Sequence, residues 1–359
     1  MTERGGHLGP VTFQCGGRRI QPYSVAPWAE EKVDPSLPSI LKVLRGDFFC
    51  LPFGGNARSF HHEEHPVHGE TANAKWSFES LEEREGRTCL HLSLKTKVRR
   101  GRVDKRIFIE DGHSVVYCQH QLSGFAGPMN LGHHAMLKFP AEPGSGRIST
   151  SPFVVGQVCP ETFERPEKGG RSALKIGAEF LTLERVPLAA GNYTDLTSYP
   201  ARPGFEDLVM LVSDADVPFA WTTVTFPKER YVWFALKNQR ILRETIFWIS
   251  NGGRSYEPWN GRHSCVMGIE DVTSYFHFGL AESARKNPIS DRGFPTHVDL
   301  DPVHPLVVPY IMGVEAIPDG FDRVTGVEGT DDGVVFRSAS GKTVPAAVEL
   351  DFLNPEIHW

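Results

Sequence analysis

Short stretches in which apolar and polar residues alternate are the main structural signal along this chain. In residues 88–98 (TCLHLSLKTKV), leucine occupies every second position of the central part, which places the leucines on one face of a β-strand. Residues 102–122 contain two such runs joined by Asp111-Gly112, a pair typical of tight hairpin turns. The pattern therefore predicts antiparallel strands here.

Similar runs, rich in β-branched and aromatic residues, recur along the rest of the chain. They are separated by glycines (35 in total) and prolines (27 in total) that are spread over the whole length. These runs predict further strands at 152–158, 207–213, 219–226, 230–236, 244–250, 264–270, 306–313, 333–337 and 346–352.

Helical patterns are few. Residues 38–46 predict one short helix, and residues 274–286 predict a second, with Ser274 as its N-cap. The chain has no βαβ alternation, no GxGxxG and no P-loop, and no repeat of fixed period. Proline-rich residues 22–38 and 140–166 are expected to form surface loops. We expect an all-β fold of large antiparallel sheets, in a single domain over residues 1–359.

Composition and charge narrow the classes of function. The hydrophobic fraction of 40% and the charged fraction of 23% suit a globular protein with a large core. A net charge of −6 gives no reason to expect a nucleic-acid or membrane partner. The N-terminal residues lack the apolar segment of a secretory signal. Six cysteines lie far apart without a CxxC pair, so we expect a reduced, cytoplasmic protein.

Four histidines and three glutamates crowd into residues 61–70 (HHEEHPVHGE). Imidazole and carboxylate groups are good ligands for zinc, iron or manganese, so one hypothesis is a metal-dependent, cupin-like enzyme that uses the His61–His68 cluster. Against it, Glu63 stands where the first cupin motif needs a histidine, and no HExxH sequence is present. We therefore interpret His61, His62, Glu63 and Glu64 as a solvated loop tip, leave His65 unassigned, and predict no metal.

His68 belongs to a different pattern. It is followed by Gly69 and later by Trp76, and it is preceded by LPFGGNAR at 51–58. This order of a Pro/Gly/Asn/Arg loop, a His-Gly pair and a tryptophan resembles the aldose 1-epimerase, or galactose mutarotase-like, family.

Two later segments extend the resemblance over residues 40–280. In NLGHHAMLKFP (130–140), His134 aligns with the second functional histidine of the family, and in SCVMGIEDVTSYF (264–276), Glu270 takes the place of its catalytic glutamate. Ala135 replaces the usual proline, and Asp271 follows the glutamate where proline is common. The chain therefore resembles a distant branch of the family.

The resemblance implies a β-supersandwich and a reaction without a cofactor. A mutarotase interconverts the two anomers of a free sugar by one general base and one general acid. Glu270 would accept the proton of the C1 hydroxyl, His134 would protonate the ring oxygen, and His68 would hold the sugar. Substrate-binding roles would fall to the polar and aromatic side chains of Asn56, Arg58, Trp76, Trp259 and Arg262.

Each of these residues also has an ordinary structural interpretation. Glu270 is equally typical of a salt-bridged strand end, His134 of a hydrogen-bonded core histidine, and Trp248 of the core. A sugar-binding protein without turnover is the main alternative function, and a polysaccharide lyase on a related sandwich is another. Neighbouring residues of a strand face opposite sides, so we also expect one of His133 and His134 to point into the core and the other away from it.

Overall fold

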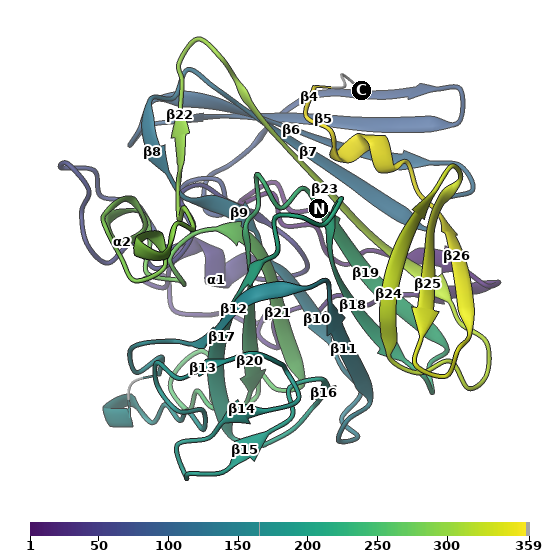
Figure 1. The fold of residues 1–359 in the computed structure, drawn as a ribbon. Coiled ribbons are helices and arrows are strands. Elements are labelled where there is room, and N and C mark those ends of the chain that lie inside the picture. The colour runs from purple at the N-terminus through teal and green to yellow at the C-terminus, as the bar shows by residue number, and fades with distance from the viewer. Residues whose placement is uncertain (165, 357–359) are drawn as a thin grey trace.

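The computed structural model describes residues 1–164 and 166–356, and its main components are two large antiparallel sheets (Figure 1). One sheet has eight strands. Their order is β13 (Glu179–Phe180), β12 (Phe153–Val158), β17 (Phe205–Ser213), β20 (Glu244–Asn251), β21 (Val266–Thr273), β9 (Leu131–His133) and β3 (Phe49–Cys50), with β10 (Ala135–Lys138) also paired to β21.

The second sheet has nine strands and includes the hairpin predicted around Asp111-Gly112. Their order is β16 (Ser198–Tyr199), β11 (Gly146–Thr150), β18 (Ala220–Phe226), β19 (Tyr231–Lys237), β23 (Leu306–Ala316), β7 (Val115–Ser123), β6 (Gly101–Glu110), β5 (Arg87–Thr96) and β4 (Ser77–Arg84).

The remaining strands form smaller sheets. The short pairs are β1 (Phe13–Cys15) with β2 (Arg18–Ile20), β14 (Val186–Pro187) with β15 (Tyr193–Thr194), and β8 (Gly127–Met129) with β22 (Val298–Leu300). A three-stranded sheet follows near the C-terminus: β24 (Val324–Thr330), β25 (Gly333–Ser338) and β26 (Thr343–Ala347). The helices are α1 (Ser39–Val43) and α2 (Leu280–Ala284), with 3-10 turns at Pro166–Lys168, Ser290–Arg292 and Leu350–Leu353. Among the described residues, no helix is long and apolar enough to cross a membrane.

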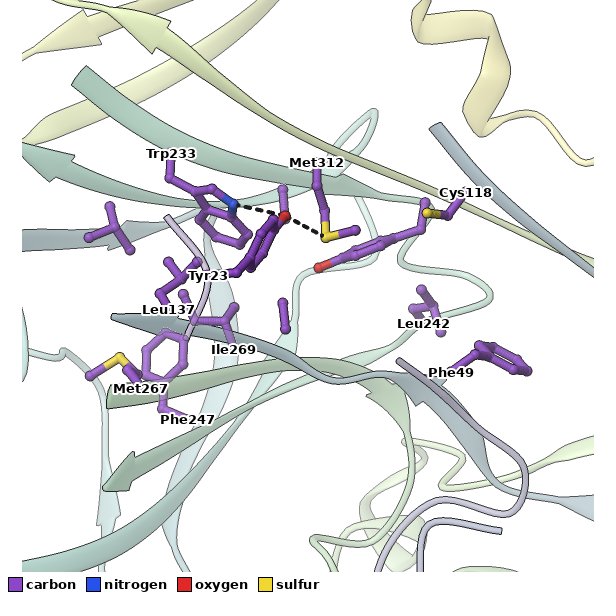
Figure 2. Close-up of a cluster of buried hydrophobic side chains, with 14 of the residues drawn as sticks. Tyr23, Phe49, Cys118, Leu137, Trp233, Leu242, Phe247, Met267, Ile269 and Met312 are labelled. Atoms are coloured by element: carbon purple, nitrogen blue, oxygen red, sulfur yellow. Dashed lines mark hydrogen bonds between the residues drawn. The ribbon is translucent and has the colours of Figure 1, made fainter. Parts of the chain in front are cut away.

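Alternation along the strands divides the apolar residues into three layers. Phe247 on β20 belongs to the core between the two large sheets, whereas its neighbour Trp248 packs in a second layer on the outer face of the eight-stranded sheet. Figure 2 shows the inner layer, where Tyr23 hydrogen-bonds Trp233 and Met312. A third layer, which includes Phe234, joins the nine-stranded sheet to β24–β26. The second layer is the one that surrounds the candidate site.

The all-β prediction is confirmed, and three local predictions need correction. The helix expected at 274–286 begins only at Leu280, because Gly279 has a φ of +115°, which no helix accommodates, and Ser274 is a buried residue of the preceding turn. The loop expected at 140–166 contains β11, and the strand expected at 346–352 ends at Ala347. The single domain over 1–359 stays a prediction.

Candidate active site

Glu270 lies on the outer face of the eight-stranded sheet because of its position in β21. Its neighbours Ile269 and Asp271 point into the core between the sheets, where the Asp271 carboxylate accepts a hydrogen bond from the Tyr310 hydroxyl. Glu270 therefore faces the other way, and its side chain is only 3% exposed. Gly268, two residues earlier, leaves room for it, since a Cβ there would lie 2.7 Å from Glu270 Oε1.

His133 and His134 divide between the two faces as predicted. His133 points into the core, where its Nδ1 lies 2.9 Å from Asp47 Oδ2 and its ring stacks on Tyr310. His134 points outward, and its ring stacks on Phe48 at 4.5 Å between centroids. Asp47 also accepts a hydrogen bond from the backbone N–H of His134, so one buried carboxylate fixes both histidines.

His68 reaches the same face from a loop whose conformation requires glycine at position 69. Gly69 has a φ of +74°, and a Cβ there would lie 2.0 Å from the carbonyl oxygen of Leu51. His68 itself has a φ of +57°, and its Nδ1 accepts a hydrogen bond from the backbone N–H of Gly54 at 3.3 Å. The His-Gly pair thus aims the Nε2 side of the imidazole away from the loop.

His68, His134 and Glu270 converge on one cavity of about 180 Å³. Nε2 of His134 lies 3.2 Å from Oε1 of Glu270, and the His68 and His134 ring centroids are 5.0 Å apart. These three residues come from three segments separated by more than 60 positions of the chain. Their meeting places a carboxyl group and two imidazoles within reach of one small ligand.

Burial gives this group unusual proton affinities. Loss of solvent raises the pKa of Glu270 well above its ordinary value, although the positive charge of Arg254 opposes the shift. The same desolvation lowers the pKa of His134 to about 3 and that of His68 well below its ordinary value. Both shifts favour the uncharged form of each group, and their contact allows one proton to be shared between the Glu270 carboxyl and His134 Nε2.

Arg254 is the only cationic side chain among the described residues that line the cavity. Its Nε donates a hydrogen bond to Glu164 Oε1 at 2.5 Å and lies 3.8 Å from Glu206 Oε1. Burial, the largest influence, raises the pKa of Glu206 to about 7, and Arg254 opposes that rise. The guanidinium also lies over the rings of Trp259 and Trp248, at 4.4 and 5.0 Å from their centroids. Arg254 is thereby fixed in the same cavity as Glu270 and His134.

Of the five residues expected to bind substrate, Trp259 is the one that lines the cavity. Asn56 uses its side chain to hold the loop: the amide donates to the carbonyl oxygens of Gly54 and Pro66 and accepts from the N–H of Leu280. Arg58 is 68% exposed and lies 3.5 Å from Glu282. Both side chains are therefore engaged outside the cavity.

Trp76 and Arg262 also lie away from the cavity. Trp76 is a core residue whose Nε1 donates to the carbonyl oxygen of Thr71. Arg262 forms a bidentate ion pair with Glu31 at the surface. Trp248 is a buried core residue, as the sequence favours, and it also forms part of the cavity wall.

The histidine-rich segment does not act as one cluster. His61 and His62 are exposed, whereas Glu63 is partly buried, bonded to Arg99 and, at 3.0 Å, to His65 Nε2. The prediction of a solvated tip was thus wrong for Glu63, because the nearby guanidinium draws its carboxylate inward. In the part of the chain that the structure describes, no three His, Cys, Asp or Glu side chains are arranged to hold a metal ion.

Sequence reasoning missed Arg254 and His277, both of which line the cavity. Arg254 lies in the segment between β20 and β21, where nothing in the sequence distinguished it from Arg262. His277 falls in the segment taken as helix. Its Nδ1 has no hydrogen-bond partner among the described residues, and burial lowers its pKa to about 4.

Comparison with known proteins shows which solved structures share this fold. No protein-family model and no curated protein matches the chain. Among solved structures, a protein provisionally described as an aldose 1-epimerase from Klebsiella pneumoniae superposes with a TM-score of 0.59 and 14% identity, over 88% of this chain and 75% of that one.

Two more solved structures give the same result. A protein provisionally described as a mutarotase from Salmonella typhimurium has a TM-score of 0.55 and 10% identity, over 87% of this chain and 85% of its own. One from Escherichia coli K12, provisionally described as an aldose 1-epimerase, has a TM-score of 0.52 and 11% identity, over 78% and 86%. The chain has a galactose mutarotase-like fold, at sequence identities typical of distant relatives.

Proposed function

We propose that this protein binds a monosaccharide in the cavity and interconverts its anomers, with Glu270 and His134 as the acid–base pair. The observation that carries the proposal is the 3.2 Å contact between the Glu270 carboxyl and His134 Nε2, beside His68, in one small cavity. The reaction needs no cofactor, and the cytoplasmic location expected from the sequence is part of the proposal.

The chemistry follows from the single proton shared by the pair. Ring opening requires removal of the proton from the C1 hydroxyl and delivery of a proton to the ring oxygen. Whichever of Glu270 and His134 holds the shared proton acts as the acid, and its partner acts as the base. Ring closure after rotation about C1–C2 reverses both transfers, so each turnover restores the pair. His68, held by Gly54, would hydrogen-bond the oxygen on which charge develops.

Mutation of the pair tests the assignment. Glu270→Gln and His134→Asn should each slow the catalysed exchange of α and β anomers by about 10²–10⁴-fold, the usual contribution of a general acid or base. NMR exchange spectroscopy or polarimetry on a panel of aldoses measures this rate. Glu64→Gln and His62→Asn provide matched controls, since both residues are exposed and lie in the histidine-rich segment. Equal rates for the wild type and both site variants would refute the assignment.

The pH dependence gives an independent check. The pair is active while it holds one proton, and on the acid side it loses that state only when His134 also gains a proton, near its pKa of about 3. We therefore expect kcat/KM to show no fall near pH 6.5, the ordinary pKa of histidine, as the pH decreases from 8 to 5. A loss of kcat/KM on acidification with a midpoint near pH 6.5 would contradict the shared-proton mechanism. Sugar binding without any acceleration would instead support the alternative of a non-catalytic binding protein.

A further inference from the structure

The cavity is poor in groups that recognise hydroxyls. Among the described residues that line it, only five have polar side chains, and the rest are apolar except for Gly55. The polar five are His68, His134, Arg254, Glu270 and His277. The proposed chemistry occupies His134 and Glu270, so few side chains are left to bind the remaining hydroxyls of a sugar.

Hydrogen bonds within the protein further reduce the number of polar atoms that are available to bind sugar hydroxyls. Nδ1 of His68 already accepts a hydrogen bond from Gly54, and Nε of Arg254 donates to Glu164. The indole N–H of Trp248 is used by Glu206 at 3.0 Å. Asn56 and Arg58, the side chains that the family resemblance would assign to hydroxyl binding, point elsewhere.

One wall is a continuous aliphatic surface. Ile40, Leu41 and Leu44 of the α1 region line the cavity, and Ile40 and Leu44 are 3% and 4% exposed. Val67 extends this wall from the loop that precedes His68. A hydroxyl placed against such a wall loses its water and gains no partner, whereas a methyl group there is favourable.

Taken together, and resting on the proposed function, these observations lead us to infer that the ligand is a neutral 6-deoxy sugar whose methyl group contacts Ile40, Leu41 and Leu44. The reacting end, with the ring oxygen and the C1 hydroxyl, faces Glu270 and His134. Trp259 and Trp248 provide apolar surface for a sugar face.

The positive charge of Arg254 does not make an anionic sugar the favoured ligand. Its guanidinium already lies between two buried carboxyl groups, Glu164 and Glu206, at 2.5 and 3.8 Å. These two carboxyl groups already offset the guanidinium charge, and a carboxylate or phosphate on the ligand would lie close to them. The side chain is also packed over Trp259, which leaves it in place as a fixed positive charge at the cavity wall.

A series of sugars that differ only at C6 tests the inference. 6-Deoxy-D-glucose, D-glucose and D-glucuronate share one ring configuration, and D-fucose, D-galactose and D-galacturonate form a second such series. Isothermal titration calorimetry on the wild-type protein should show the 6-deoxy sugar of at least one series binding roughly tenfold or more tightly than its parent hexose, the effect of one buried hydroxyl without a partner. The uronate should bind more weakly still. Equal or tighter binding of both parents, or of a uronate, would overturn the inference.

A variant at Leu41 tests whether the aliphatic wall causes the preference for the deoxy sugar. Leu41→Asn has nearly the same size and adds groups that hydrogen-bond a hydroxyl, so it should reduce the preference for the deoxy sugar by about tenfold. Leu181→Asn is the matched control, because Leu181 is 87% exposed and distant from the cavity lining. Circular dichroism shows whether each variant is folded. An unchanged preference in folded Leu41→Asn would exclude this wall as the contact for the deoxy carbon.

Measurements of affinity and of turnover test the two proposals independently. The ratio of dissociation constants within a series decides the deoxy-sugar inference, whether or not the protein accelerates anomer exchange. The rate of exchange, with Glu270→Gln as reference, decides the proposed function. Rapid exchange of all sugars with no preference for the deoxy members would leave the proposed function standing and refute the inference.

Discussion

At the scale of single residues, function depends on which way neighbouring side chains point. His133 and His134 are adjacent, yet one stacks on Tyr310 in the core and the other on Phe48 beside the cavity. Asp47 contacts both, through the imidazole of His133 and the backbone of His134. A conservative change at Asp47 would therefore disturb the acid–base pair without touching it.

Gly69 offers a test of how the His-Gly pair is built. Gly69→Ala places a Cβ 2.0 Å from the Leu51 carbonyl oxygen in a left-handed conformation, so we expect a loss of about 3 kcal/mol in the free energy of unfolding. Gly191→Ala is the control: its φ is +91°, but its Cβ would meet nothing within 4 Å, so only the backbone cost of about 1–2 kcal/mol applies. Urea denaturation measures both. Equal losses would show that the close approach to Leu51 is unimportant.

Residue patterns predicted part of the candidate site, and the reason is local. The order of His68, His134 and Glu270 along the chain was visible because each lies in a short segment of recognisable composition. Arg254 was not, because its role comes from Glu164, 90 positions earlier, and from two tryptophan rings. Arg58 matched the expected residue type, but its side chain extends into solvent, which no sequence pattern specifies.

At the scale of elements, alternating runs and runs rich in β-branched and aromatic residues predicted most strands of the two large sheets, including β18–β21, which are buried on both faces. They failed at strands of two to five residues and at the exposed edge strand β4. β11 has only five residues beside Pro-rich turns, and it is included in the sheet by pairing with β18. The helix bounds were wrong for a different reason: Tyr275, Phe276 and Phe278 fit a helical pattern, yet they pack in the second hydrophobic layer as part of a turn before Gly279.

The three-stranded sheet β24–β26 provides a prediction about an element. Phe336 on β25 is fully buried and packs against Phe234 of the nine-stranded sheet at 5.0 Å between centroids. Phe336→Ala should lower the free energy of unfolding by about 3–5 kcal/mol, because it leaves a cavity in the third layer. Phe78→Ala is the matched control, since Phe78 is 66% exposed and its loss should matter by less than about 0.5 kcal/mol.

Sugar affinity should be unchanged in both folded variants. Phe336 lies in the layer beyond the nine-stranded sheet, and the candidate site lies beyond the other large sheet. Chemical denaturation gives the stability, and calorimetry gives the affinity. A loss of affinity in folded Phe336→Ala would mean that the outer layers are coupled through the core.

For the whole molecule, the buried histidines determine how stability responds to acid. Desolvation lowers the pKa of seven histidines below the ordinary value of 6.5; they are His7, His65, His68, His120, His134, His263 and His277. Each is neutral in the folded chain and binds a proton in the unfolded chain below pH 6.5. The unfolded state then holds more protons, so stability falls as pH decreases below that value.

Three buried glutamates act in the opposite direction. Burial raises the pKa of Glu206 to about 7, that of Glu244 to about 8, and that of Glu270 well above its ordinary value. Each keeps its proton when folded and loses it when unfolded above pH 4.5, so stability decreases as pH rises. Because the seven histidines outnumber them below pH 6.5 and stop contributing above it, stability should be greatest near pH 6.5.

His120 isolates one of these contributions. Its ring stacks on Phe49 at 3.9 Å between centroids, and neither ring nitrogen has a hydrogen-bond partner among the described residues. The imidazole therefore loses its hydration on folding and gains no hydrogen bond in return. His120→Leu removes a group that must be kept neutral. Relative to wild type, the variant should gain about 2 kcal/mol more stability at pH 5 than at pH 7, the effect of one proton over 1.5 pH units. Urea denaturation at both pH values measures the difference. Leu181→Asn, at an exposed position without a titratable group, should leave the pH dependence as in wild type. An equally steep acid loss in His120→Leu would show that His120 does not contribute to it.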